Sequence, residues 1–199
     1  MVKKLRQGEP LYLAPGIKGW IDNQYRAKVI DEKNGQFLNP DNTFDKIKIY
    51  ERQVKGWFLN RASRFLRGDK NDLIVLMVCL SYLEGIEQYR RGESSHRRSQ
   101  EFFKGTIHRL YPGKYSDPDL TDFYHEARCG LFHNGMIDKR IIFSCTRFDS
   151  ALEFKDNGDI EVNPKLFLRD IKEDFKNYIR ELKRNRELQR NFNNQFNVR

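Results

Sequence analysis

Cysteine is scarce in this chain, and long apolar runs are absent. Among 199 residues there are three cysteines, Cys79, Cys129 and Cys145, which lie far apart and form no Cys-x-x-Cys pair. Neither a disulfide framework nor a zinc knuckle is indicated. The most apolar run, Leu73 to Leu83, is too short to cross a bilayer and contains Ser81. We therefore expect a soluble protein of the reducing cytoplasm with no membrane partner.

Several enzyme motifs are missing as well. The chain has no Gly-x4-Gly-Lys-Ser/Thr loop, no Gly-x-Gly-x-x-Gly after a strand and no Gly-x-Ser-x-Gly elbow. The basic start, Met1 to Arg6, is not followed by the apolar segment of a signal peptide. Nucleotide hydrolysis and serine hydrolase chemistry are therefore unsupported.

Positive charge, in contrast, is abundant. The chain has 37 Lys and Arg against 28 Asp and Glu, a net charge of +9. Basic clusters lie at Arg52 to Arg67 and at Lys183 to Arg190. A further cluster supplies the candidate nucleic-acid-binding residues, which are Arg90, Arg91, Arg97 and Arg98. Any one cluster has a solvated helix face as its simpler explanation, but together they favour an anionic partner.

The first part of the chain shows no clean periodicity. Pro and Gly punctuate residues 1–42, which we interpret as an N-terminal extension. A short helix containing Trp20, Ile21, Tyr25 and Val29 is one interpretation of this segment, and a loosely attached arm is the other.

Apolar residues recur at helical spacing through most of the chain after residue 42. This spacing predicts helices over about 43–66, 69–91 and 97–110, a fourth from Asp117 to near Gly135, and a last one from Pro164 through Leu182. Thr43 is the expected N-cap of the first helix. We assign residues 43–190 to one helical domain and residues 191–199 to a frayed, Asn-rich tail.

The periodicity changes to that of strands between the fourth and last helices. Residues 141–147 are predicted to form a strand, and residues 152–155 and 160–162 a hairpin. A three-residue loop with Gly158 in a left-handed bulge places Leu152, Phe154, Ile160 and Val162 on one face, whereas a two-residue turn would split them.

The fourth helix carries the most unusual sequence, Arg128-Cys129-Gly130-Leu131-Phe132-His133, followed by Asn134 and Gly135. It resembles the Arg-x4-His motif of HEPN domains. This resemblance implies a mainly α fold, an antiparallel HEPN-like bundle with a small β-hairpin insertion before the last helix. It also implies a metal-independent endoribonuclease that acts as a homodimer, in a toxin or antiviral-defence setting with a protein regulator or antitoxin. Cys129 departs from the family pattern, since many catalytic members have a polar residue there.

The residue types suit RNA cleavage without a cofactor. Attack by the RNA's own 2′-hydroxyl requires proton removal there and proton donation to the leaving oxygen, and histidine, with a pKa of about 6.5, serves both. A guanidinium can contact two phosphoryl oxygens and keeps its charge. We predict that His133 transfers protons and that Arg128 binds the phosphate. The supporting candidates are Asn134, Cys129, Glu84 and His125.

Geometry leaves alternatives open. On an α-helix, residues five apart point about 140° apart, so Arg128 and His133 share a face only if the helix loosens or a second subunit contributes. Arg128 in a structural salt bridge, with His133 favoured by the helix dipole, is the simpler interpretation. A metal held by His125, Cys129 and His133 is disfavoured, because the two histidines lie about 12 Å apart along the axis. Glu84 is more often expected to pair with Arg90 or Arg91.

Two rival functions have the same expected fold. One is a module that binds RNA or a nucleotide without cutting it, and the other is an interaction protein that dimerises or regulates a partner.

Overall fold

The computed structural model describes residues 5–66, 72–144 and 149–198. Contacts divide the chain into two compact units. Unit 1 comprises Met1–Arg61, Tyr89–Glu93 and Asn177–Arg199, and unit 2 comprises Ala62–Gln88 and Ser94–Lys176. Each unit contains both helices and a sheet.

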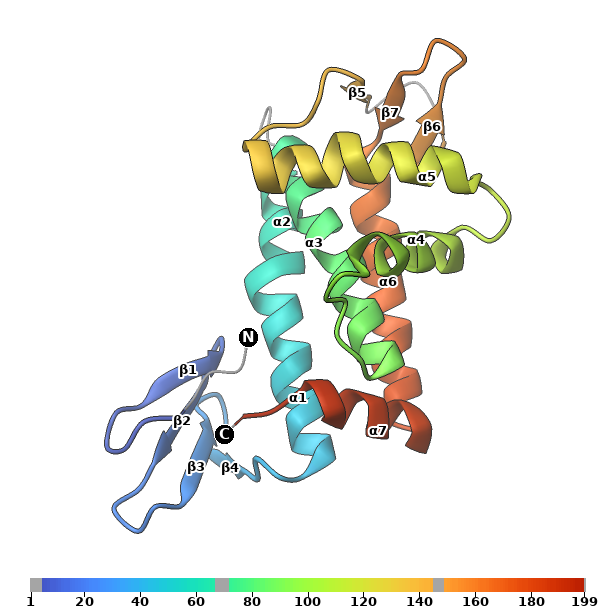
Figure 1. Cartoon of the computed structure of the whole chain (residues 1–199). Coiled ribbons are helices and arrows are strands. Elements are labelled where there is room, and N and C mark those ends of the chain that lie inside the picture. The colour runs from blue at the N-terminus through green and yellow to red at the C-terminus, as the bar shows by residue number, and fades with distance from the viewer. Residues whose placement is uncertain (1–4, 67–71, 145–148, 199) are drawn as a thin grey trace. The chain divides into compact units, whose positions relative to one another are not determined.

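Unit 1 opens with a four-stranded antiparallel sheet (Figure 1). Its strands, in spatial order, are β1 (Leu11–Ala14), β2 (Ile17–Ile21), β3 (Ala27–Asp31) and β4 (Gln36–Leu38). Tight turns with positive φ at Gly16, Tyr25 and Gly35 join them. The predicted short helix around Trp20 and Val29 is therefore wrong, because these residues lie on paired strands.

The helices of unit 1 pack around aromatic side chains. The helical segments are α1 (Thr43–Gln53), the π-helix η1 (Val54–Leu59), the start of α2 (Asn60–Phe65) and α7 (Arg186–Gln195). Asn42, not Thr43, is the N-cap of α1, and its side chain accepts from two backbone N–H groups. Tyr50 contacts Phe192 and Phe196 at ring distances of 5.4 and 5.7 Å. The tail expected to fray thus forms a helix with buried rings.

Unit 2 is built on helices that enclose a phenylalanine-rich core. It contains most of α3 (Asp72–Arg91) and α6 (Pro164–Leu182), together with α4 (Ser99–Leu110), α5 (Asp117–Phe123) and the π-helix η2 (Tyr124–Asn134). Its fully buried phenylalanines are Phe102, Phe103, Phe123, Phe167 and Phe175. Asp174, also buried, accepts hydrogen bonds from Tyr82 and Arg109, so the core includes a paired charge.

A three-stranded sheet follows η2 in unit 2. It comprises β5 (Ile141–Phe143), β6 (Leu152–Phe154) and β7 (Ile160–Val162), in the order β5-β7-β6. Leu152 pairs with Val162 and Phe154 with Ile160, and Gly158 has a φ of 86°. The predicted hairpin register is therefore confirmed. The part of the predicted strand beyond residue 144 lies outside the described residues.

The prediction of a mainly α bundle with one small hairpin is wrong. Of the residues that the structure describes, 55% are helical, and the strands among them form two sheets, so the class is α+β. The strands of residues 1–42 are only three to five residues long, and so short a stretch contains too few alternations to reveal a period of two. The division that we predict at residues 42 and 190 stays a prediction. None of the described helices is long and apolar enough to span a membrane.

Candidate active site

The segment with the Arg-x4-His motif is a π-helix, not the α-helix expected from sequence. Ser116 caps α5 with a capping box, and at Tyr124 the helix changes to η2, which ends at Gly135 with a φ of 76°. The chain then folds back, and Asp138 N donates to Glu126 O at 3.0 Å. A Cβ at position 130 would lie 2.7 Å from Met136 O, so the return of the chain requires glycine at Gly130.

This helix type brings Arg128 and His133 together. Because its backbone hydrogen bonds span five residues, residues five apart lie near the same face. Arg128 Nη1 lies 3.4 Å from His133 Nε2. A guanidinium can only donate, so Nε2 of the imidazole is the acceptor in this contact. A histidine nitrogen that accepts a hydrogen bond can also take a proton.

Glu84 on α3 holds the other side of the guanidinium. Arg128 Nη2 donates to Glu84 Oε2 at 3.0 Å, and Ser95 Oγ donates to Glu84 Oε1 at 2.5 Å. Both carboxylate oxygens are therefore used, and Glu84 pairs with Arg128 instead of with Arg90 or Arg91 as expected. Ser95, which no motif marks, is not among the residues predicted from the sequence.

Two aromatic rings also contact this arginine. The centre of the Arg128 guanidinium lies 5.5 Å from the ring centroids of both Tyr124 and Phe132, a distance at which a cation is attracted to a ring face. Burial lowers the pKa of Arg128, whereas Tyr124 and Glu84 raise it, and the net displacement is upward. The guanidinium is thus a fixed positive charge.

The pair remains accessible from solvent. The Arg128 side chain is 20% exposed, and His133 and Asn134 are exposed at the end of η2. His125, near the start of η2, is exposed, and its ring centroid lies 5.4 Å from that of Tyr124. Cys129 is half-buried. Arg128, His133 and Glu84 therefore form a connected group that borders solvent. Within the described parts of the chain, no group of three or more His, Cys, Asp or Glu is placed to hold a metal.

The predicted nucleic-acid-binding arginines are divided between the units. Arg90 and Arg91 belong to unit 1, and Arg97 and Arg98 to unit 2. Arg90 donates to Glu181 at 3.2 Å, and Arg98 makes two bonds of 2.8 Å to Glu101. Arg97 is exposed, with a φ of 62°. Arg90 and Arg98 therefore already neutralise acids of their own unit.

Another histidine of unit 2 has a carboxylate partner. His108 Nε2 lies 2.7 Å from Asp117 Oδ1. Both side chains are on the surface, 40% and 67% exposed. The two residues are nine positions apart in the sequence and lie on different helices, α4 and α5, so helical spacing does not predict their contact.

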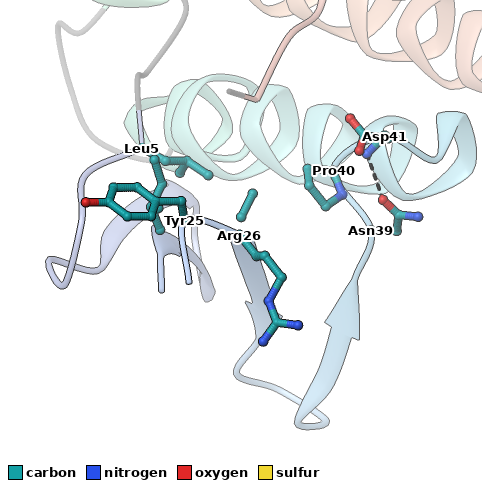
Figure 2. Close-up of a pocket in the computed structure, with 8 residues that line it drawn as sticks. Leu5, Tyr25, Arg26, Asn39, Pro40 and Asp41 are labelled. Atoms are coloured by element: carbon teal, nitrogen blue, oxygen red, sulfur yellow. Dashed lines mark hydrogen bonds between the residues drawn. The ribbon is translucent and has the colours of Figure 1, made fainter. Parts of the chain in front are cut away.

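Unit 1 contains a pocket of about 420 Å³ (Figure 2). Tyr25 and Arg26, from the turn after β2, and Asn39 and Asp41, after β4, line it together with apolar side chains. Asp41 N donates to Asn39 Oδ1 at 2.9 Å. No histidine or cysteine lines this pocket, so the group around Arg128 is the better candidate for acid–base chemistry.

No family model matches the chain, and neither does any curated protein or solved structure. The resemblance to HEPN domains thus rests on the motif residues themselves.

Proposed function

We propose that this protein is a metal-independent endoribonuclease of the cytoplasm that cleaves RNA through its 2′-hydroxyl group. The observation that carries the proposal is the 3.4 Å contact between Arg128 Nη1 and His133 Nε2 at the surface. It supports the proposal because an imidazole, which can accept a proton, lies next to a permanent cation that can bind phosphate.

The chemistry follows from these two groups. His133 Nε2 takes the proton of the 2′-hydroxyl, whose oxygen attacks the adjacent phosphorus. The bond from phosphorus to the 5′-oxygen breaks, and that oxygen takes a proton from the imidazolium or from a second copy's imidazolium. The products are a 2′,3′-cyclic phosphate and a 5′-hydroxyl end. Arg128 stabilises the charge that develops on the phosphoryl oxygens.

Glu84 positions the guanidinium and takes no part in proton transfer. It accepts from Nη2, so Nη1 and Nε remain directed elsewhere. Arginine has five N–H groups, and a phosphate can replace His133 as the partner of Nη1 while Glu84 keeps its bond. Replacement of this one contact frees the Nε2 lone pair for the 2′-hydroxyl.

A homodimer is part of the proposal. Phe132 and Met136, on either side of His133 in sequence, are 45% and 60% exposed, and exposed apolar side chains near a site favour burial against a partner. A second copy would bring another imidazole to the same cleft, as the resemblance to HEPN domains implies. A toxin or defence role, with a protein regulator or antitoxin, follows from that resemblance alone.

The experiment is cleavage of single-stranded RNA by the full chain in excess chelator. We expect cyclic-phosphate ends, and we expect His133→Ala to slow cleavage by about 10²- to 10⁴-fold, the usual contribution of a general acid–base group. Arg128→Ala should lose a comparable factor. The matched controls are His96→Ala and Arg169→Ala, two exposed side chains of unit 2 outside the site.

Three results would overturn the proposal. Cleavage that chelator abolishes would indicate a metal. Cleavage that survives both site variants would place the chemistry elsewhere or in a contaminant. Tight, salt-sensitive binding without any cutting would assign the binding module instead.

A further inference from the structure

The outer face of the sheet in unit 1 carries aromatic and basic side chains in register. Tyr12 pairs with Lys18, Lys18 with Ile30, and Ile30 with Phe37, so these four residues form one row across all four strands. Trp20 and Lys28 pair in the next row on the same face, since alternate residues of a strand share a face.

The opposite face is the one that the core covers. Gly19, Val29 and Leu38 form its central row, and all three are buried. Asp31, on this face, is bound by Arg52 of α1 at 2.5 and 2.8 Å. The sheet therefore packs on α1 by one face only.

Aromatic rings on the outer face are accessible. Tyr12 is 50% exposed and Phe37 63% exposed, although strands of a soluble domain more often place polar residues there. The two rings lie on β1 and β4, three strand spacings apart, and strands are about 4.8 Å apart, so the row spans roughly 14 Å. A four-stranded sheet that exposes aromatic rings can stack two or three unpaired bases.

The charges on this face are arranged for a polyanion. Lys18 lies between Tyr12 and Phe37 in one row, and Lys28 lies beside Trp20 in the next. The acids that pair with them, Glu32 and Asp22, lie just beyond the strand ends. Lys18 Nζ is 2.6 Å from Glu32 and 4.9 Å from the Tyr12 ring centroid. Lys28 Nζ is 3.8 Å from Asp22. Both ion pairs are partly exposed, and ion pairs at a protein surface contribute little free energy, so phosphates can replace the acids as partners of these lysines.

We propose that the outer face of the β1–β4 sheet is a docking platform for a single strand of RNA. The rings of Tyr12, Trp20 and Phe37 stack on unpaired bases, and Lys18 and Lys28 contact the phosphates between them. This inference rests on the proposed RNA substrate, though not on its cleavage. It assigns a function to part of residues 1–42, which we interpret from the sequence only as an N-terminal extension.

The test is binding of a fluorescently labelled oligouridylate to the full chain carrying His133→Ala, measured by anisotropy in chelator. We expect Tyr12→Ala and Phe37→Ala each to weaken binding by roughly 5- to 150-fold, the usual effect of one stacking ring. The matched control is Phe44→Ala, which removes a 56% exposed ring from α1 of the same unit. Circular dichroism verifies that each variant is folded.

Fluorescence of Trp20 supplies a second measurement. Trp57→Phe leaves Trp20 as the single tryptophan of the chain. Oligouridylate should quench its emission, and heparin, a polyanion without bases, should not. Equal quenching by both, or equal affinity of the Tyr12→Ala, Phe37→Ala and Phe44→Ala variants, would overturn the platform. So would an absence of RNA binding, which would leave a protein as the partner of this face.

The outcomes separate this inference from the proposed function. Binding that depends on the rings, in a chain that never cleaves RNA, would retain the platform and refute the nuclease. The opposite result is also possible. If cleavage depends on His133 while Tyr12→Ala and Phe37→Ala change neither the cleavage rate nor the RNA affinity, the nuclease is retained and the platform is refuted.

Discussion

Replacing Glu84 by glutamine removes the charge of the carboxylate and keeps its shape. The two oxygens of Glu84 accept from Arg128 Nη2 at 3.0 Å and from Ser95 Oγ at 2.5 Å. In Glu84→Gln the amide oxygen can still accept from the guanidinium, and the amide N–H can donate to the serine hydroxyl. Both hydrogen bonds survive, so the substitution isolates the contribution of the ion pair.

The magnitude follows from burial. The Glu84 and Arg128 side chains are only 18% and 20% exposed, so solvent screens the pair in part. Hydrogen bonds to charged groups contribute about 1.5–3 kcal/mol and neutral ones about 0.5–1.5 kcal/mol. We expect Glu84→Gln to lower the free energy of unfolding by about 1 kcal/mol, or the Tm by roughly 2–4 °C. Glu84→Ala, which leaves Arg128 and Ser95 without this acceptor, should cost about 2–4 kcal/mol.

The assay is urea unfolding of the parent chain, Glu84→Gln, Arg128→Gln and the double variant, because such a cycle isolates the pairwise coupling. Glu173→Gln is the matched control, since Glu173 is 55% exposed in its pair with Lys176, and should cost under about 0.5 kcal/mol. Coupling near zero would refute the argument that Glu84 holds Arg128. With the chain fully folded, a lower kcat at unchanged KM for RNA would distinguish positioning of Arg128 from a purely structural role.

Two further predictions concern the scaffold of each unit. The bond from Arg52 lowers the pKa of Asp31 from 3.8 to about 2, so the pair stabilises the fold fully above about pH 4 and this stabilisation is lost as the pH falls through about 2. Asp31→Asn should therefore reduce the free energy of unfolding by about 2 kcal/mol at pH 7. Urea titrations at decreasing pH should show this difference from the parent chain shrinking towards pH 2. A difference independent of pH would contradict the argument. Gly130→Ala places a Cβ 2.7 Å from Met136 O, so we expect the free energy of unfolding to fall by about 1–3 kcal/mol, as measured by thermal unfolding. An unchanged Tm would show that the segment after η2 does not pack on this glycine.

Sequence patterns located the local features that rest on a few neighbouring residues. The start of α5 at Asp117, the left-handed Gly135 at the end of η2 and the hairpin around Gly158 were all predictable. Each depends on one turn or cap, whose conformation is dictated by proline, serine or glycine within a few positions. Neighbouring residues therefore predict where a helix or strand begins or ends better than they predict which elements it packs against.

The errors arose where the structure depends on pairing over longer distances. Glu84 and Arg128 are 44 residues apart, and no spacing rule connects them, so the sequence favoured nearer arginines. The sheet of residues 11–38 was missed because each strand gains its stability from its neighbour, not from its own periodicity. The π-helix was missed because its sequence still has apolar residues at α-helical positions, and only the fold-back onto Gly130 reveals the wider turn.

The spacing of the motif and the type of helix support the same chemistry. In a regular α-helix the five-residue spacing would turn Arg128 and His133 about 140° apart, so the two would not share a face. In η2 the same spacing brings Nη1 and Nε2 to 3.4 Å. Glu84 fixes the far edge of the guanidinium, so a bound phosphate needs to displace only the imidazole. In the proposed reaction the displaced group is the proton acceptor for the 2′-hydroxyl, and phosphate binding would therefore activate the base in the same step.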